Sequence, residues 1–162
     1  MAGIKYHDAQ DVALDIKKIC TVLDMDHIDL NRVFCIRSIG TGSRNIIARC
    51  HSLPKILQQV LNIEPAYVIE VISEKYDGAD EEEKTKILIH ELAHIPKTFG
   101  GGFIHHNVVR DSFINKLYKK YRENLKKYPS SYPSSLEEPT NPANPENEQP
   151  KRDFSLGNWL DD

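Results

Sequence analysis

The sequence has 162 residues, of which 40% are hydrophobic and 28% charged, and its formal net charge is −3. That length predicts one domain, the composition excludes a collagen-like or wholly disordered chain, and the charge is too near neutral to indicate a polyanionic partner by itself. No apolar run approaches the roughly 18 residues of a membrane span, and we expect no secretory signal. The three cysteines form no C-x-x-C pair, so we expect a cytoplasmic protein with reduced thiols.

The composition changes sharply after residue 128. Six of the nine prolines follow it, in a stretch of Ser, Asn, Glu and Pro with too little apolar surface to offset the entropy of ordering. The sequence therefore predicts one folded domain over residues 1–128 and a disordered tail over residues 129–162. Segment 153–162 regains apolar side chains and is either a docking motif for a protein partner or a frayed end with chance aromatics. Its apolar residues are Phe154, Leu156, Trp159 and Leu160.

The first half of the predicted domain contains two helices and two strands. Apolar residues at spacings of three and four predict an amphipathic helix over residues 8–25. Residues 32–39 and 45–50 predict short strands, separated by a glycine-containing turn at residues 40–43. A short helix is expected over residues 53–61.

The second half contains a strand and two helices. Residues 66–73 are rich in β-branched side chains and predict a strand. Asp80 is a candidate N-cap, so a helix is expected over residues 81–95, ended by Pro96. A glycine-rich loop follows, and then a last helix over residues 109–127. Together the elements predict an α+β fold in which a small sheet packs against the capped helix.

The capped helix carries the sequence His90-Glu91-Leu92-Ala93-His94, which has the form H-E-x-x-H. Residues four apart project from the same face of a helix, so both imidazoles can bind one zinc ion. Glu91 is offset by one position, where it can contact a zinc-bound water and act as the general base of a hydrolase. The sequence therefore predicts a zinc site with His90 and His94 as ligands and Glu91 as the catalytic base.

A catalytic zinc ion requires a third protein ligand. His105 and His106 follow the glycine-rich loop at residues 100–102, which can return the chain to the metal. We favour His106, because it lies closer to the last helix, where the backbone is better fixed. His105 would then support a ligand or stabilise the oxyanion of the intermediate. The reverse assignment stays open, and Asp111 is a weaker candidate.

The strand predicted over residues 66–73 is a candidate for substrate binding. A metallopeptidase usually binds its substrate as an added strand beside an exposed sheet edge, through main-chain hydrogen bonds. Tyr67–Ile72 is therefore a candidate substrate-binding strand. The alternative, which is nearly as well supported, is an interior strand of the sheet.

The chain resembles a known family, the metallopeptidases found in archaea and phages. Those proteins share an H-E-L-x-H-I-P core followed by a glycine-containing loop and a further histidine. The matching segments here are K-I-L-I-H-E-L-A-H-I-P-K-T-F-G-G-G-F-I-H-H-N (86–107), A-R-C-H-S-L-P (48–54) and P-A-Y-V-I-E-V (65–71). The resemblance spans about residues 32–110. More remotely, the chain is similar to SprT-type zinc proteases, which cut proteins crosslinked to DNA.

The resemblance implies a minimal zincin-like fold, with His90 and His94 as zinc ligands and Glu91 as the base. It leaves the third ligand undecided, because two adjacent histidines follow the loop. The resemblance indicates the type of reaction but does not identify the substrate. The leading hypothesis is a zinc metalloendopeptidase that hydrolyses peptide bonds with a metal-activated water.

Two other hypotheses stay open. Residues 110–127 carry seven Lys and Arg side chains against two acids. Such a basic helix is usually a solvated face, but it could also contact nucleic acid, as in a SprT-like protease. Alternatively, the zinc fold is not catalytic and recruits a protein partner through segment 153–162.

Overall fold

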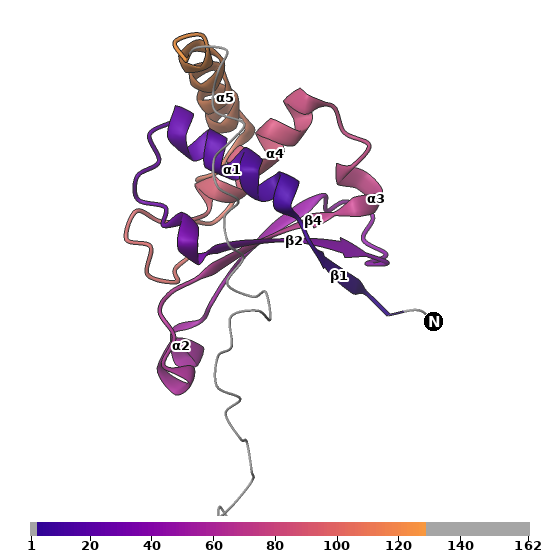
Figure 1. The fold of residues 1–162 in the computed structure, drawn as a ribbon, viewed down its shortest axis with the longest axis vertical. Coiled ribbons are helices and arrows are strands. Elements are labelled where there is room, and N and C mark those ends of the chain that lie inside the picture. The colour runs from indigo at the N-terminus through magenta and orange to yellow at the C-terminus, as the bar shows by residue number, and fades with distance from the viewer. Residues whose placement is uncertain (1–2, 129–162) are drawn as a thin grey trace, which may run out of the picture.

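A computed structural model describes residues 3–128 of the chain. The predicted tail over residues 129–162 and its candidate docking motif lie outside the described residues. Within them, four strands form one sheet, and a group of helices packs on it (Figure 1). This mixed architecture with a small sheet confirms the predicted α+β class.

The sheet has the strand order β1-β2-β4-β3. Its two central strands, β2 (Val33–Ile39) and β4 (Tyr67–Ile72), run parallel. The two outer strands, β1 (Lys5–Asp8) and β3 (Ala48–Ser52), pair antiparallel with them. The candidate substrate-binding strand Tyr67–Ile72 is therefore an interior strand. The prediction that it offers a free edge is wrong, because β2 and β3 use its backbone groups on both sides.

Three helices pack together on one side of the sheet. Helix α4 contacts α1, α5 and β3, and α1 also contacts β2, whereas α2 lies apart from this group (Figure 1). No helix within residues 3–128 combines the length and the apolar character that crossing a membrane requires. The helices are α1 (Gln10–Val22), the 3-10 turn η1 (Leu30–Arg32), α2 (Lys55–Leu61), α3 (Ser73–Tyr76), α4 (Glu81–Ala93) and α5 (Asp111–Leu125).

Helix α4 begins where the sequence predicts. The side chain of Asp80 accepts a hydrogen bond from the backbone N–H of Glu83, at 2.8 Å. Three glutamates occupy the first turn, where negative charge is favoured by the helix dipole. The last helical residue is Ala93, and His94 caps the C-terminus with helical dihedral angles. The second histidine of the motif therefore lies at the end of the helix, where the chain turns into the following loop.

One side of α4 is anchored in the hydrophobic core. Leu88, Leu92 and Ile95 are almost completely buried, and they share one cluster with Tyr67 and Ile69 of β4. Burial of each large aliphatic side chain stabilises the fold by about 1.5–3 kcal/mol. This packing holds the helix against the sheet.

Three short elements differ from the sequence prediction. The strand β1 and the single-turn helix α3 were not predicted, because each has only four residues and neither length produces a clear periodic pattern. The strand expected from residue 45 begins at Ala48, because residues 43–46 form a turn. In that turn the hydroxyl of Ser43 accepts a hydrogen bond from the backbone N–H of Ile46, at 3.2 Å.

The strand β3 forms one edge of the sheet, next to α4. The hydrogen bond from the Ile72 N–H to the Ile47 carbonyl, at 2.9 Å, sets which residues bond to β4. Backbone groups in an antiparallel pair point alternately toward and away from the partner strand. The N–H and C=O groups of Ala48, Cys50 and Ser52 therefore point away from β4, toward the side of the sheet where α4 lies.

Candidate metal centre

The fold brings three histidines from two segments into one cluster. His90 and His94 lie one helical turn apart at the end of α4, and His106 follows the returning loop. Their ligand nitrogen atoms all lie within 4.8 Å of one another. The ring centroids of His94 and His106 are 4.4 Å apart, and those of His90 and His94 are 4.9 Å apart. Such a set of nitrogen atoms could hold one metal ion.

The imidazole of His94 is oriented by the loop. Its Nδ1 atom hydrogen-bonds to the backbone carbonyl of Ile104, and the backbone N–H of Ile104 donates to the His94 carbonyl, at 2.9 Å. Because a carbonyl only accepts, Nδ1 carries the proton and Nε2 carries the lone pair. Nε2 is buried and has no hydrogen-bond partner within the described residues. A buried, unpartnered lone pair in a cluster of imidazoles fits a metal ligand.

The environment of the cluster favours neutral imidazoles. Burial lowers the pKa of His90, and the neighbouring histidines lower it further, against a smaller opposing effect from Asp111. Burial likewise lowers the pKa of His94. Neutral imidazole is the form that binds a metal ion, so the lowered pKa values of His90 and His94 favour metal binding.

The loop that carries His106 is fixed by the sheet beneath it. The hydroxyl of Tyr67, a fully buried residue of β4, accepts a hydrogen bond from the N–H of Gly101 at 3.0 Å and donates one to the carbonyl of Gly102 at 2.9 Å. Gly101 has a φ of +85°, in the left-handed region. The interior strand, although it offers no edge, therefore positions the segment that leads to the third histidine.

The structure distinguishes the two adjacent histidines. His106 belongs to the three-histidine cluster, whereas His105 does not. The exposed His105 instead has its ring 6.1 Å from that of Phe103 and accepts backbone hydrogen bonds from Val108 and Val109 through its carbonyl. The carboxylate of Asp111 lines the same cleft but is outside the cluster. The arrangement therefore favours His106 as the third ligand.

Glu91 lies beside the cluster in a buried position. It is 7% exposed, and burial raises the pKa of its carboxyl to about 7, although a hydrogen bond from the Cys50 backbone N–H acts in the opposite direction. Cys50 is one of the residues of β3 whose backbone points away from β4. The sheet edge thus holds the carboxylate that the sequence predicts as the base.

A cleft of about 850 Å³ runs between β3 and the helices α4 and α5, and it contains the cluster and Glu91. Its walls include Ile46 and Ile47 before β3, Ile87 of α4 and Ile114 of α5. Two residues of β3, Arg49 and His51, also line it. This is a size that accommodates several residues of an extended peptide or a comparably large ligand.

Sequence reasoning missed two of the groups that build this site. The Cys50 N–H carries no side-chain signal, because a backbone donor is present at almost every position. The hydroxyl of Tyr67 was missed because the tyrosine lies in a strand pattern, where it counts only as an apolar, strand-forming residue. Both contacts connect residues far apart in the chain, so only the folded arrangement reveals them.

Gly101 supplies a test of how strongly the loop controls the site. A Cβ at this position would lie 2.1 Å from Nε2 of Gln58 and 2.8 Å from the carbonyl oxygen of Leu53. We expect Gly101→Ala to displace the loop and to weaken Zn²⁺ binding about 10-fold or more, measured by calorimetric titration of metal-free protein. Gly100→Ala is the matched control, since its Cβ would approach only Thr98 Oγ1, at 3.8 Å. Equal affinities in the two variants would show that the loop does not position a ligand.

The third ligand has its own test. We expect His106→Ala to weaken Zn²⁺ binding about 100-fold or more, because the cluster loses one of three donors. His105→Ala should bind Zn²⁺ like the unmodified protein, since that ring lies outside the cluster. Both affinities would be measured by competition with a chromophoric chelator. Loss of binding in the His105 variant instead would reverse the assignment.

The buried carboxyl predicts a pH dependence of stability in the metal-free protein. The pKa of Glu91 rises from 4.5 to about 7 on folding, so its contribution to stability is complete below pH 4.5 and is lost as the pH rises through 7. Glu91→Gln removes the charge. At pH about 8 the metal-free variant should therefore have a free energy of unfolding on the order of 2 kcal/mol higher than the unmodified protein.

Urea unfolding in the presence of a chelator, followed by circular dichroism, measures this difference. The free energies of unfolding of the two proteins should converge as the pH falls below 4.5, where the Glu91 carboxyl becomes protonated in both the folded and the unfolded state. Glu83→Gln, an exposed position of the same helix, is the matched control. A Glu91→Gln variant that is less stable than the unmodified protein at the higher pH would contradict the burial argument.

The comparisons with known proteins agree with this geometry. No curated protein and no solved structure matches the chain. The sequence profile of one family, described as "Putative phage metallopeptidase", matches residues 4–130. The matched region contains the sheet, α4 and the three-histidine cluster, and it confirms the resemblance to phage metallopeptidases. Because the match covers most of the chain, the protein belongs to this family, whose name indicates a metal-dependent peptidase.

Proposed function

We propose that the protein is a zinc-dependent endopeptidase of the H-E-x-x-H type, with a minimal zincin-like fold. The observation that carries the proposal is the three-histidine cluster, with its nitrogen atoms within 4.8 Å of one another, beside a buried carboxylate. Three histidine ligands with a remaining open position are typical of catalytic zinc sites, whereas structural sites are closed by a fourth protein ligand.

The donor set also favours zinc over the other common metals. Imidazole suits zinc, copper, iron and nickel, whereas magnesium and calcium prefer oxygen donors. Peptide hydrolysis needs no redox change, which favours a metal that undergoes none. When bound, zinc would lower the pKa of its water and polarise the scissile carbonyl. His90, His94 and His106 would hold it.

Glu91 would act as the general base and then as the acid. It would accept the proton of the attacking water and return it to the leaving amine. In the metal-free protein burial raises the pKa of this carboxyl to about 7, and a neighbouring zinc ion would favour the ionised form that accepts the proton. The Cys50 N–H faces this carboxylate and lowers its pKa, so the carboxylate lies beside β3.

The free edge of β3 is the best-placed surface for a peptide substrate. It borders the cleft that contains the cluster, and the backbone groups of Ala48 and Ser52 point away from β4. An extended peptide could pair with them as an added strand, as in other cases of strand addition. Ala48–Ser52, rather than the earlier candidate Tyr67–Ile72, is therefore proposed as the substrate-binding strand.

Cleavage of unfolded casein by the zinc-loaded protein tests the proposal. Glu91→Gln should lower the rate about 100-fold or more, because general-base catalysis commonly contributes that factor. The metal content of the variant should stay equal to that of the unmodified protein, since Glu91 is not a ligand. Glu83→Gln is again the matched control and should cleave normally.

Two outcomes would overturn the proposal. If the Glu91 variant cleaves as fast as the unmodified protein, the assigned base is wrong. If the protein binds zinc but cleaves no peptide or protein substrate, the alternative of a non-catalytic zinc fold that recruits a partner is favoured instead.

A further inference from the structure

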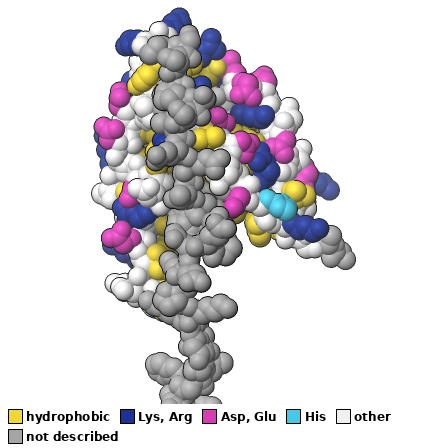
Figure 2. All heavy atoms as spheres, viewed as in Figure 1, with side chains coloured by type: hydrophobic (Ala, Val, Ile, Leu, Met, Phe, Trp, Pro, Cys, Tyr) yellow, Lys and Arg dark blue, Asp and Glu magenta, His cyan; other side chains and the backbone are white. Residues whose placement is uncertain are grey.

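A cationic face covers the outward side of α5. The buried side of this helix is formed by Ile114 and Tyr121, and the helical period gathers basic residues on the opposite side over about three turns. Figure 2 shows Lys and Arg side chains gathered at the end of the molecule where α5 ends. We define the cationic face as Lys116, Lys119, Lys120, Arg122, Lys126 and Lys127.

The folded domain leaves the charge of this face unbalanced. Within residues 3–128, none of its members forms an ion pair. Arg122 donates to the neutral hydroxyl of Tyr118, at 3.3 Å, and Lys127 to the side-chain carbonyl of Asn124, at 3.5 Å. Glu123 is the single acid between residues 116 and 127. Residues 3–128 therefore supply no anionic partner that would neutralise this surface.

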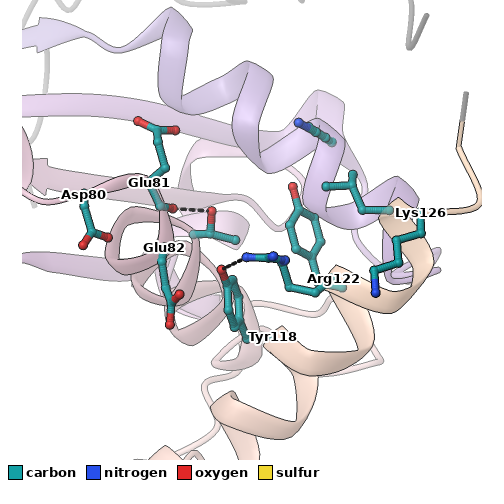
Figure 3. Close-up of a pocket in the computed structure, with 10 residues that line it drawn as sticks. Asp80, Glu81, Glu82, Tyr118, Arg122 and Lys126 are labelled. Carbon is teal, nitrogen blue, oxygen red and sulfur yellow. Dashed lines mark hydrogen bonds between the residues drawn. The ribbon is translucent and has the colours of Figure 1, made fainter. Parts of the chain in front are cut away.

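The pocket between α4 and α5 does not receive such a partner. Figure 3 shows Arg122 and Lys126 on the α5 side of this pocket and Asp80, Glu81 and Glu82 on the α4 side. Glu81 and Glu82 pair with lysines of their own helix, at 3.8 and 2.7 Å. An acidic ligand that entered the pocket would meet these carboxylates as like charges. Arg122 and Lys126 therefore form the border of the cationic face with this pocket. The four other members of the face lie outside the pocket and are the favoured surface for an anionic partner, namely Lys116, Lys119, Lys120 and Lys127.

The segment that follows α5 has the complementary charge. Residues 110–127 contain seven basic and two acidic side chains, a net charge of +5, whereas residues 129–162 contain two basic and seven acidic side chains, a net charge of −5. Exposed charges attract each other within a Debye length, which is about 8–10 Å at moderate salt. The acids of the segment are Glu137, Glu138, Glu146, Glu148, Asp153, Asp161 and Asp162.

The connection between the two segments permits this contact. The end of α5 is fixed on α1, where the side-chain amide of Asn124 donates to the Val22 carbonyl at 2.9 Å. The eight residues 129–136 precede the first acids, and they can span about 26 Å when extended. Helix α5 has 15 residues and is about 22 Å long. The first acids can thus reach every member of the cationic face, at an effective concentration on the order of millimolar.

We propose that the acidic segment 137–162 of this chain lies along the cationic face of α5 and shields it from nucleic acids and other polyanions. Single surface ion pairs are weak, so the contact depends on several pairs together and on low ionic strength. Neither the three-histidine cluster nor the cleft takes part in this contact, which is therefore independent of the proposed peptidase activity.

Carbodiimide crosslinking of the full-length protein tests the contact directly, because this reagent joins a lysine to a carboxylate only when the two touch. At about 20 mM salt, mass spectrometry should find crosslinks between Lys119, Lys120 or Lys126 and the glutamates of segment 137–148. The crosslinks should decrease at least about 10-fold at about 0.5 M salt, where the Debye length falls to a few ångströms. Absence of these crosslinks at low salt would overturn the proposal.

A mixture of isotopically labelled and unlabelled protein identifies the occupant of the face. Crosslinks within one chain support the proposal, whereas crosslinks that join labelled to unlabelled chains would assign the face to a second copy and overturn it. Glu81→Gln with Glu83→Gln, two exposed positions of α4, is a control that should leave the crosslinks unchanged.

Binding of a fluorescent DNA duplex tests the shielding. The tail variant replaces four glutamates by glutamine, and at about 50 mM salt it should bind the duplex about 10-fold or more tightly than the unmodified chain. Adding Lys119→Gln and Lys120→Gln should remove this gain. If the tail variant and the unmodified chain have equal affinities, or if neither binds, shielding is refuted. The four positions are Glu137, Glu138, Glu146 and Glu148.

Discussion

The contact between the His94 imidazole and the Ile104 carbonyl is the interaction on which the rest of the centre depends. It joins the end of α4 to the loop that returns with His106, so it sets the distance between ligands from two segments. It also places the imidazole proton on Nδ1 and leaves the Nε2 lone pair buried, with no partner among residues 3–128. A buried unpartnered group costs about 1–3 kcal/mol. A bound metal ion would remove this cost, which couples metal binding to the stability of the fold.

The buried Glu91 shows the same relation between stability and chemistry. A carboxyl that is 7% exposed and has its pKa raised to about 7 destabilises the metal-free fold near neutral pH. The hydrophobic anchor of α4, built on Leu88, Leu92 and Ile95, offsets such a cost, because each buried aliphatic side chain contributes about 1.5–3 kcal/mol. The apolar side of the helix thus offsets the cost of burying the Glu91 carboxyl, which is the proposed base.

The strands have separate tasks, which follow from their places in the sheet. The interior strand β4 uses its backbone for pairing and its Tyr67 hydroxyl to hold the glycine-rich loop. The edge strand β3 has backbone groups that do not bond to β4, and one of them, the Cys50 N–H, faces Glu91. The loop that leads to the three-histidine cluster is therefore held by the centre of the sheet, and the cluster is bordered by the edge strand β3.

The sequence by itself determined the parts of the site that depend on local periodicity. His90 and His94 share a face and Glu91 lies beside them because a helix repeats every 3.6 residues, and the Asp80 cap fixes where that helix begins. Only the tertiary structure decided that His106 rather than His105 joins the cluster, and that β3 rather than β4 is the edge strand. Adjacent histidines are equivalent in spacing, and strand order is a matter of long-range pairing, so neither could be read from local pattern: the contact from Gly101 to Tyr67 alone spans 34 positions.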